Sequence, residues 1–163
     1  MLFLVFQLGK DRYALDANQI SEVLPVVDIK ELPQAPPGVV GVFDLRGAPV
    51  PVLDLSQLAL GSPAPRLLST RLVIVHYPDD RGDTRLLGLI LEKATETVRR
   101  DPTDFADSGI TIDRALYLGP VATDTRGLLQ RVDVSTLLPA SAREVLFTRP
   151  TEQPWRSPSS KTC

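Results

Sequence analysis

The chain has 163 residues, of which 43% are hydrophobic and 23% are charged, values typical of a folded globular protein. Its net charge is −2; residues 148–163 contribute +2, so residues 1–147 carry −4 from 15 basic and 19 acidic side chains. Proteins that bind nucleic acid need a clustered basic face to neutralise phosphates, and this sequence shows no such cluster. The composition therefore argues against nucleic-acid binding.

The inventory of reactive side chains excludes most enzyme classes. Cys163 is the only cysteine and His76 the only histidine, which rules out disulfide scaffolds, cysteine zinc sites and multi-histidine metal sites. His76 lies in an apolar run, which favours a structural or strand-edge role over catalysis. Neither phosphate-binding pattern, GxxxxGK[ST] or GxGxxG, occurs, and no pair of carboxylates stands out for hydrolysis. We predict no catalytic residue, no metal and no cofactor.

The chain begins with two predicted strands. Leu2–Leu8 is a nearly continuous apolar run that predicts a buried strand, and Tyr13–Ala17 predicts its partner after a polar turn. The first run is too short to span a membrane, and it lacks the basic segment and cleavage site of a signal peptide. We therefore expect a cytoplasmic protein with no direct membrane insertion.

The next segment has the apolar spacing of a helix. Ile20, Val23 and Leu24 stand at positions i, i+3 and i+4, which predicts a short helical turn with these three side chains facing inward. Glu22 falls off that apolar face, and Pro25 ends the turn.

The centre of the chain, Gly38–Leu58, reads GVVGVFDLRGAPVPVLDLSQL and predicts two apolar strands joined by a tight turn, with Arg46 at its tip. Gly41 interrupts the first strand, which indicates a bulge or a close backbone approach. Pro49 and Pro51 remove two N–H groups from the same side of the second strand, so this strand must pair mainly through its other side. The sequence leaves open whether Arg46 makes an internal ion pair or contacts a partner.

The second half predicts two further hairpins. Arg71–Tyr77 and Arg85–Leu91 form the first, with the second strand continuing through Glu92–Arg99, and Ala115–Leu118 and Arg126–Val134 form the other. Outside these strands we predict a linker at Gly61–Pro65, a loop over Arg100–Ile112, a short helix at Ser135–Leu138, a last strand or helix at Glu144–Phe147, and a flexible Pro/Ser-containing tail over 148–163.

Many short strands separated by Gly/Pro turns predict an all-β fold with short helices, arranged as a barrel or sandwich. The two halves also echo each other, since Asp54–Leu58 (DLSQL) recurs as Asp133–Leu137 (DVSTL), and each half opens with an apolar hairpin. We therefore predict two pseudo-repeated small β-barrel subdomains with a boundary near residues 59–70.

From Phe3 to about Leu138 the sequence resembles the CheW-like domain family, the adaptors of bacterial chemosensory arrays. The resemblance lies in LVFQLGKDRYALDANQISEVLP, LPQAPPGVVGVFDLRGAPVPVLDL, RLLGLILEKATETV and YLGPVATDTRGLLQRVDVSTLL, in the family's order. It implies a domain over 1–147 made of two interlocked, SH3-like five-stranded β-barrels, with no cofactor and no reaction. It also implies a cytoplasmic adaptor, recruited to membrane-bound receptor arrays for chemotaxis-type signal transduction.

The partners implied by the resemblance are the cytoplasmic helical hairpin of a chemoreceptor, the regulatory domain of a CheA-type histidine kinase of a two-component system, and other CheW-like domains. By position, Ile20, Glu22 and Val23 match the segment that forms the family's receptor-facing groove. Gly41 and Arg46 match the family's sensitive glycine and the arginine of its Leu-Arg-Gly turn. Without the resemblance, the plainer interpretation makes Ile20 and Val23 core residues, Glu22 a solvated residue and Gly41 a packing residue.

The sequence departs from the family pattern at several positions. Asp44 stands where asparagine is common, which predicts competition with other acids for Arg46, and Glu92 replaces a usual aspartate. Gln130 and Arg131 bring polarity into a usually apolar strand. These differences indicate a specialised adaptor, with a Wsp-type surface-sensing pathway as the first choice and pilus-linked or flagellar systems as others. The alternative from another class is a small β-barrel enzyme or ligand-binding domain that uses a cleft between the halves.

Overall fold

The computed structural model describes residues 1–79, 82–109, 115, 117–138 and 143. The predicted element at Glu144–Phe147, the predicted tail over 148–163 and Cys163 lie outside these residues. The strands are β1 (Leu2–Leu8), β2 (Asp11–Asp16), β3 (Ile20–Pro25), β4 (Lys30–Glu31), β5 (Val39–Leu45), β6 (Ala48–Asp54), β7 (Arg71–Pro78), β8 (Thr84–Arg99), β9 (Leu118–Asp124) and β10 (Gly127–Val132). The helices are α1 (Leu55–Leu60) and the short 3₁₀ helices η1 (Ala17–Gln19), η2 (Pro102–Asp104) and η4 (Val134–Thr136).

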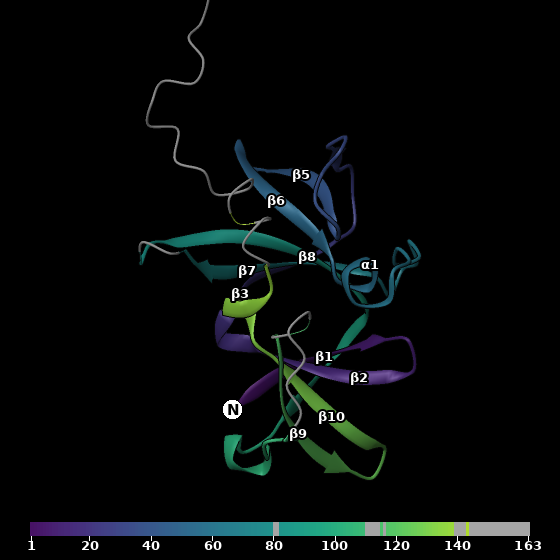
Figure 1. Ribbon diagram of the computed structural model, residues 1–163, viewed down its shortest axis with the longest axis vertical. Coiled ribbons are helices and arrows are strands. Elements are labelled where there is room, and N and C mark those ends of the chain that lie inside the picture. The colour runs from purple at the N-terminus through teal and green to yellow at the C-terminus, as the bar shows by residue number, and fades with distance from the viewer. Residues whose placement is uncertain (80–81, 110–114, 116, 139–142, 144–163) are drawn as a thin grey trace, which may run out of the picture.

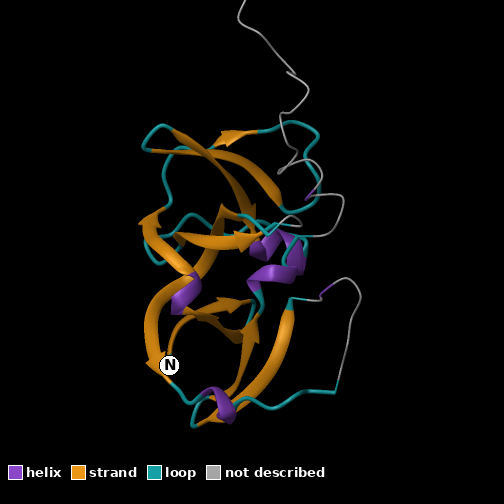
Figure 2. Cartoon of the chain, turned by 90° about the vertical axis from the view of Figure 1, so that its left-hand side faces the viewer, coloured by secondary structure: helices purple, strands orange, loops and turns teal. Residues whose placement is uncertain are grey.

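The strands are joined in a single ten-stranded sheet. Its pairing order is β4-β5-β6-β8-β1-β2-β10-β9, and β7 pairs with both β8 and β3. Figure 1 shows β5 and β6 at one end of the molecule, β1, β2, β9 and β10 at the other, and β7 and β8 between them. Figure 2 shows how little of the chain is helical. The predicted all-β class with short helices is confirmed, although strand pairing among the described residues is an open path and closes neither predicted barrel.

Strand β8 belongs to both ends of the molecule. Its first part pairs with β7 from Thr84 to Leu91 and with β6 at Gly88–Ile90, and its second part pairs with β1 from Glu92 to Arg99. Within the second part, the register against β1 shifts between Glu92 and Glu96, and Lys93 in this interval has a positive φ of 50°. One continuous strand through Arg85–Leu91 and Glu92–Arg99, as the sequence predicts, is confirmed.

Three apolar clusters form the core. The first lies in the middle of the molecule, where β7 and β8 meet β1. The second lies between β5, β6, β7 and β8, and the third lies between β1, β2, β9 and β10. Their largest fully buried members include Tyr77, Phe6, Leu53 and Leu89 in the first cluster, Leu72, Ile74 and Ile90 in the second, and Phe3 in the third. None of the described helices is long and apolar enough to cross a membrane.

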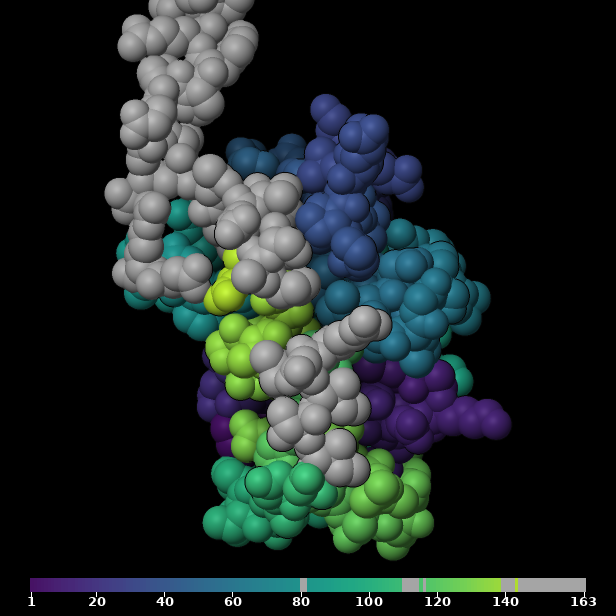
Figure 3. All heavy atoms as spheres, in the orientation of Figure 1, coloured from purple at the N-terminus to yellow at the C-terminus, as the bar shows by residue number. Residues whose placement is uncertain are grey.

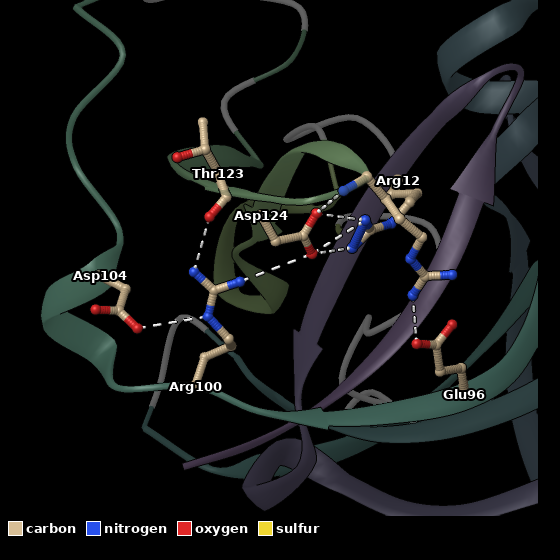
Figure 4. A network of polar contacts seen from close by, with 7 residues as sticks. Arg12, Glu96, Arg100, Asp104, Thr123 and Asp124 are labelled. Carbon is tan, nitrogen blue, oxygen red and sulfur yellow. Dashed lines mark hydrogen bonds and ion pairs between the residues drawn. The ribbon is translucent and has the colours of Figure 1, made fainter.

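A network of charged side chains fastens β2 to the β9–β10 hairpin (Figure 4). Arg12 binds both carboxylate oxygens of Asp124, with N–O distances of 2.7–3.1 Å. Arg100 approaches the same carboxylate at 3.8 Å, donates to the Thr123 carbonyl at 3.1 Å and pairs with Asp104 at 3.4 Å. Because β2 and β10 pair in parallel over only three residues, these side chains supplement a short ladder.

Two sequence predictions about local structure are wrong. Ile20–Leu24 is not a helical turn but most of strand β3, and the helical turn falls just before it as η1. The partner of β10 is not Ala115–Leu118 but β9, Leu118–Asp124, a strand that contains Gly119 and Pro120. The echo between Asp54 and Asp133 has a structural basis, because each aspartate caps a helical turn after a strand, accepting from Gln57 N at 3.1 Å and Ser135 N at 3.0 Å.

Candidate protein-binding surface

Strand β3 distributes its predicted site residues over two faces of the sheet. Ile20 lies opposite Val75 and Val23 opposite Val73, whereas Glu22 lies opposite Ile74. Because directly opposed residues point to the same side, Ile20 and Val23 share one face and Glu22 lies on the other. The register shift between Ile20 and Glu22 accounts for this arrangement.

The exposure of these side chains differs accordingly. Ile20 is half-buried against the central core cluster, while Val23 is 45% exposed. Val27, just beyond the strand, is also exposed, and the sequence analysis did not single it out. The signal available in the sequence was an apolar residue in the proline-bounded loop after Pro25. The prediction that Val23 faces inward is therefore wrong, and Val23 and Val27 are available for contact.

The β5–β6 turn holds Arg46 in a strained backbone conformation. Arg46 has φ +50° and the following Gly47 has φ +91°, the pair of positive values that a two-residue type I′ hairpin turn needs. Asp44 fixes this turn, since its carboxylate accepts from Gly47 N at 2.8 Å. Asp44 thus serves the turn backbone, and the acid that binds Arg46 is Glu22.

Arg46 and Glu22 form an ion pair between the hairpin tip and β3. Arg46 Nη1 donates to Glu22 Oε2 at 3.3 Å, and Nη2 donates to Oε1. The hydrogen bonds that Arg46 donates lower the pKa of Glu22, and the same interaction raises the pKa of Arg46. The Arg46 side chain is nevertheless 71% exposed and the Glu22 side chain 26% exposed. The internal ion pair therefore exists while most of Arg46 remains accessible from outside.

Gly41 has the structural role that its place in the strand predicts. A Cβ at this position would lie 1.9 Å from the Lys30 carbonyl oxygen and 2.9 Å from Glu31 Cα. Gly41 pairs with Glu31 on β4 and with Val52 on β6, at a register shift within β5. The predicted bulge and close backbone approach are both confirmed, and only glycine lets β4 cross here.

The prolines of β6 act as the sequence predicts. Pro49 and Pro51 lie in the part of β6 that pairs with β5, opposite Asp44 and Val42. The pairing of β6 with β8 begins only at Val52, after the second proline. Near the hairpin tip, β6 therefore pairs with β5 alone and has no hydrogen-bonded strand on its other side. The hairpin that carries Arg46 extends away from β8.

The remaining departures from the family pattern also have physical explanations. Glu92 accepts a hydrogen bond from the buried Ser56 hydroxyl at the point where β8 bends between the two groups of strands. Arg131 lies 5.1 Å from the centre of the Phe3 ring and 5.5 Å from that of Phe105, so it closes the third core cluster by cation–π contact. Gln130 donates to the Gly119 carbonyl at 3.0 Å.

The described residues contain no group of three or more His, Cys, Asp or Glu side chains placed to hold a metal ion. His76 is exposed on β7, opposite Leu86. Edge strand β3 thus carries an exposed apolar side chain, Val23, on one face and the Glu22–Arg46 ion pair on the other, and apolar contacts and charge pairs are both used in protein recognition.

Comparison with known proteins identifies the family. The CheW-like domain matches residues 2–142. Relatives named chemotaxis protein CheW include those of Helicobacter pylori, 30% identical over 63% of this chain and 59% of that protein, and Bacillus subtilis, 25% identical over 83% and 85%. The chain thus spans about three fifths of the first of these relatives.

The fold comparison agrees with the sequence comparison. The crystal structure of the scaffolding protein TtCheW from Thermoanaerobacter tengcongensis matches with a TM-score of 0.74 at 24% identity, over 86% of this chain and 89% of that one. That likeness concerns the fold, while the domain match spans nearly all of the residues described above. The chain therefore belongs to the CheW-like domain family.

Proposed function

We propose that this protein is a non-enzymatic scaffold that couples a chemoreceptor to a histidine kinase in a bacterial chemosensory complex. The observation that carries the proposal is the CheW-like domain match over residues 2–142. The fold likeness to a protein described as a scaffold supports it. The alternative, a small β-barrel enzyme or ligand-binding domain, has no comparable support from the comparisons.

The receptor partner in this proposal is a cytoplasmic helical hairpin. Val23 and Val27 provide exposed apolar contacts, and the Arg46–Glu22 pair provides charge that fixes orientation. Ile20 and Gly41 have supporting roles in this proposal. Ile20 packs against the core, and Gly41 leaves room for the backbone of β4. The five predicted residues thus divide into contact residues and supporting residues.

The second partner is the regulatory domain of a CheA-type kinase, and other CheW-like domains are further candidates. The protein would act in the cytoplasm and be recruited to membrane-bound receptor arrays. The −4 charge of residues 1–147 is consistent with protein partners rather than nucleic acid.

The test is a binding and coupling assay with purified components. The protein is mixed with the kinase regulatory domain and with a receptor cytoplasmic fragment of the same organism, and dissociation constants are measured for each pair. We expect both to bind, and Arg46→Glu to abolish receptor control of kinase activity without unfolding the protein. Full coupling by Arg46→Glu would refute the role of Arg46, and absence of binding to either partner would refute the scaffold function.

His76→Ala distinguishes the proposal from the enzyme alternative. His76 is the only imidazole in the chain and is exposed on β7. An adaptor should keep its binding and coupling in this variant, whereas an enzyme that depends on the imidazole would lose its activity.

A further inference from the structure

The turn that carries Arg46 uses a residue poorly suited to its backbone conformation. Arg46 has φ +50° and Gly47 has φ +91°, and asparagine, aspartate and glycine are the residues that fit the first of these positions best. The arginine does not compensate by bonding to the turn itself, since its guanidinium binds Glu22 on another strand. A strained backbone conformation kept at an exposed position indicates that the side chain there is used.

The rest of the hairpin is fixed by packing. Phe43 and Leu45 on β5 and Val50 on β6 are buried in the second core cluster, on either side of the tip. Arg46 and Gly47 lie between these anchors and are both exposed. The core therefore holds the two strands, and the conformation of the turn depends on interactions at the tip itself.

Asp44 provides the interaction that holds the turn. Side chains alternate along β5, so Asp44 points to solvent while Phe43 and Leu45 point to the core. The Asp44 carboxylate accepts from Gly47 N at 2.8 Å, which is the single hydrogen bond of this side chain within the described part of the chain. Because the bond joins the residues on either side of Leu45 and Arg46, it closes the backbone around Arg46.

Glu22 completes the placement of Arg46 from the neighbouring strand. Its carboxylate oxygens accept from Nη1 and Nη2 and so direct the guanidinium, whereas Asp44 directs the backbone that carries it. Arg46 is thus held at its backbone and at its guanidinium before a partner arrives, while its side chain stays 71% exposed. A contact residue held in this way loses little conformational freedom on binding.

We propose that Asp44 is a positioning residue for partner binding, whose hydrogen bond to Gly47 N sets the turn so that Arg46 meets the partner already in its binding conformation. This role needs an oxygen that accepts a hydrogen bond and not a negative charge, so asparagine should serve as well as aspartate. The inference rests on the proposed function, since it takes Arg46 as a contact for the chemoreceptor.

The first experiment compares D44A with D44N in the full chain. D44A removes both the acceptor and the charge, whereas D44N removes only the charge, so the difference between them isolates the hydrogen bond. We expect the affinity for the receptor cytoplasmic fragment to fall about fivefold in D44A and to stay within about twofold of wild type in D44N. Wild-type affinity in D44A would overturn the inference.

D107A is the matched control for loss of an exposed aspartate that bonds a glycine N–H. Asp107 accepts from Gly109 N at 2.9 Å, and Gly109 also has a positive φ, of 76°. The preceding residue, Ala106, pairs with Val121 on β9. Figure 3 shows the blue atoms of β5, β6 and the loop before them at one end of the molecule, away from the green atoms of β9 and β10 at the other. D107A should therefore leave receptor affinity unchanged.

A second measurement needs no partner. Because the hydrogen bond from Arg46 lowers the pKa of Glu22, an NMR titration of the Glu22 carboxyl reports how fully the pair is formed. In D44A we expect this pKa to rise toward its ordinary value. In D44N it should stay at or below the wild-type value, since removing the Asp44 charge favours the ionised form of Glu22. Equal values in the two variants would overturn the positioning role.

A double variant tests whether Asp44 acts through Arg46. R46A removes the contact, so adding D44A to it should weaken receptor binding no further. A further loss would show that Asp44 acts on the partner by another route and would overturn the inference. If the wild-type chain does not bind the receptor fragment, the proposed function fails, and the Glu22 titration still decides whether Asp44 places Arg46.

Discussion

Arg46 and Glu22 are 24 positions apart in the sequence, yet their side chains are joined by two hydrogen bonds. The pair connects the tip of the β5–β6 hairpin to edge strand β3, on the face of that strand opposite to Ile20 and Val23. A partner that recognises Arg46 must therefore also accommodate Glu22.

Exchanging the two charges distinguishes the role of this pair within the fold from the role of Arg46 in partner binding. Arg46→Glu places two carboxylates together and should lower the unfolding midpoint slightly, because both groups are solvated. The double variant E22R/R46E restores opposite charges and should restore the midpoint. If a partner reads the guanidinium at position 46, coupling stays lost in the double variant. Recovery of coupling would show instead that only the internal pair matters.

The pair also predicts a pH dependence. The pKa of Glu22 lies below its ordinary value of 4.5 in the folded protein, mainly because Arg46 donates a hydrogen bond to the carboxylate. Since the folded pKa is depressed, the contribution of Glu22 to stability is complete above about pH 4.5 and is lost as the pH falls through the folded pKa. The free energies of unfolding of wild type and Glu22→Gln should therefore differ most near pH 7 and become equal in acid. Denaturant titrations at several pH values test this, and a difference that grows in acid would contradict it.

Gly41→Ala should destabilise the fold by about 3 kcal/mol, because the new methyl group would overlap the Lys30 carbonyl and push β4 away. Urea denaturation measures the change. Gly119→Ala is the control, since its nearest neighbour would be the Arg131 carbonyl oxygen at 3.3 Å, and should cost less than about 1 kcal/mol. Lost partner binding at unchanged stability would show that Gly41 is a contact residue and not a packing residue.

Arg12→Met should destabilise the β2–β10 contact by about 2 kcal/mol. Arg12 is nearly buried and holds Asp124 through both carboxylate oxygens, whereas the Arg126–Glu96 pair is about half exposed. Arg126→Met should therefore cost less than about 0.5 kcal/mol. A double-mutant cycle with Asp124→Asn measures the coupling. Equal losses for the two arginine variants would show that burial does not strengthen the Arg12 pair.

The one helical turn misread from the sequence shows where sequence pattern and structure diverge. The register shift after Ile20 puts one extra residue into β3, so Ile20 and Val23 face the same side although they are three positions apart. Three-residue apolar spacing is also the mark of a helix, and the sequence alone does not distinguish the two. The same shift places Glu22 toward Arg46, a pairing that no local pattern encodes.

Features that depend on backbone chemistry were more predictable. A glycine inside an apolar strand and two prolines two positions apart restrict strand pairing whatever the rest of the fold does, and both restrictions hold at Gly41 and Pro49–Pro51. Strand β9 was misplaced because Gly119 and Pro120 resemble a turn, although proline is tolerated in a strand at a sheet edge. The exposure of Leu67 and Leu68 had no signal in the sequence, since exposure depends on tertiary packing.

Because β8 pairs with strands at both ends of the molecule, the chain cannot be cut into two independently folding halves. A fragment of residues 1–70 would keep β1 and β6 but lose the strand that pairs with both, and a fragment of residues 71–138 would keep β8 with β7 but without β1 and β6. Neither piece would retain the pairings of β8 with β1 and β6, so both ends of the protein should melt in a single transition. Whatever binds at one end is thereby mechanically connected to the other through one uninterrupted backbone.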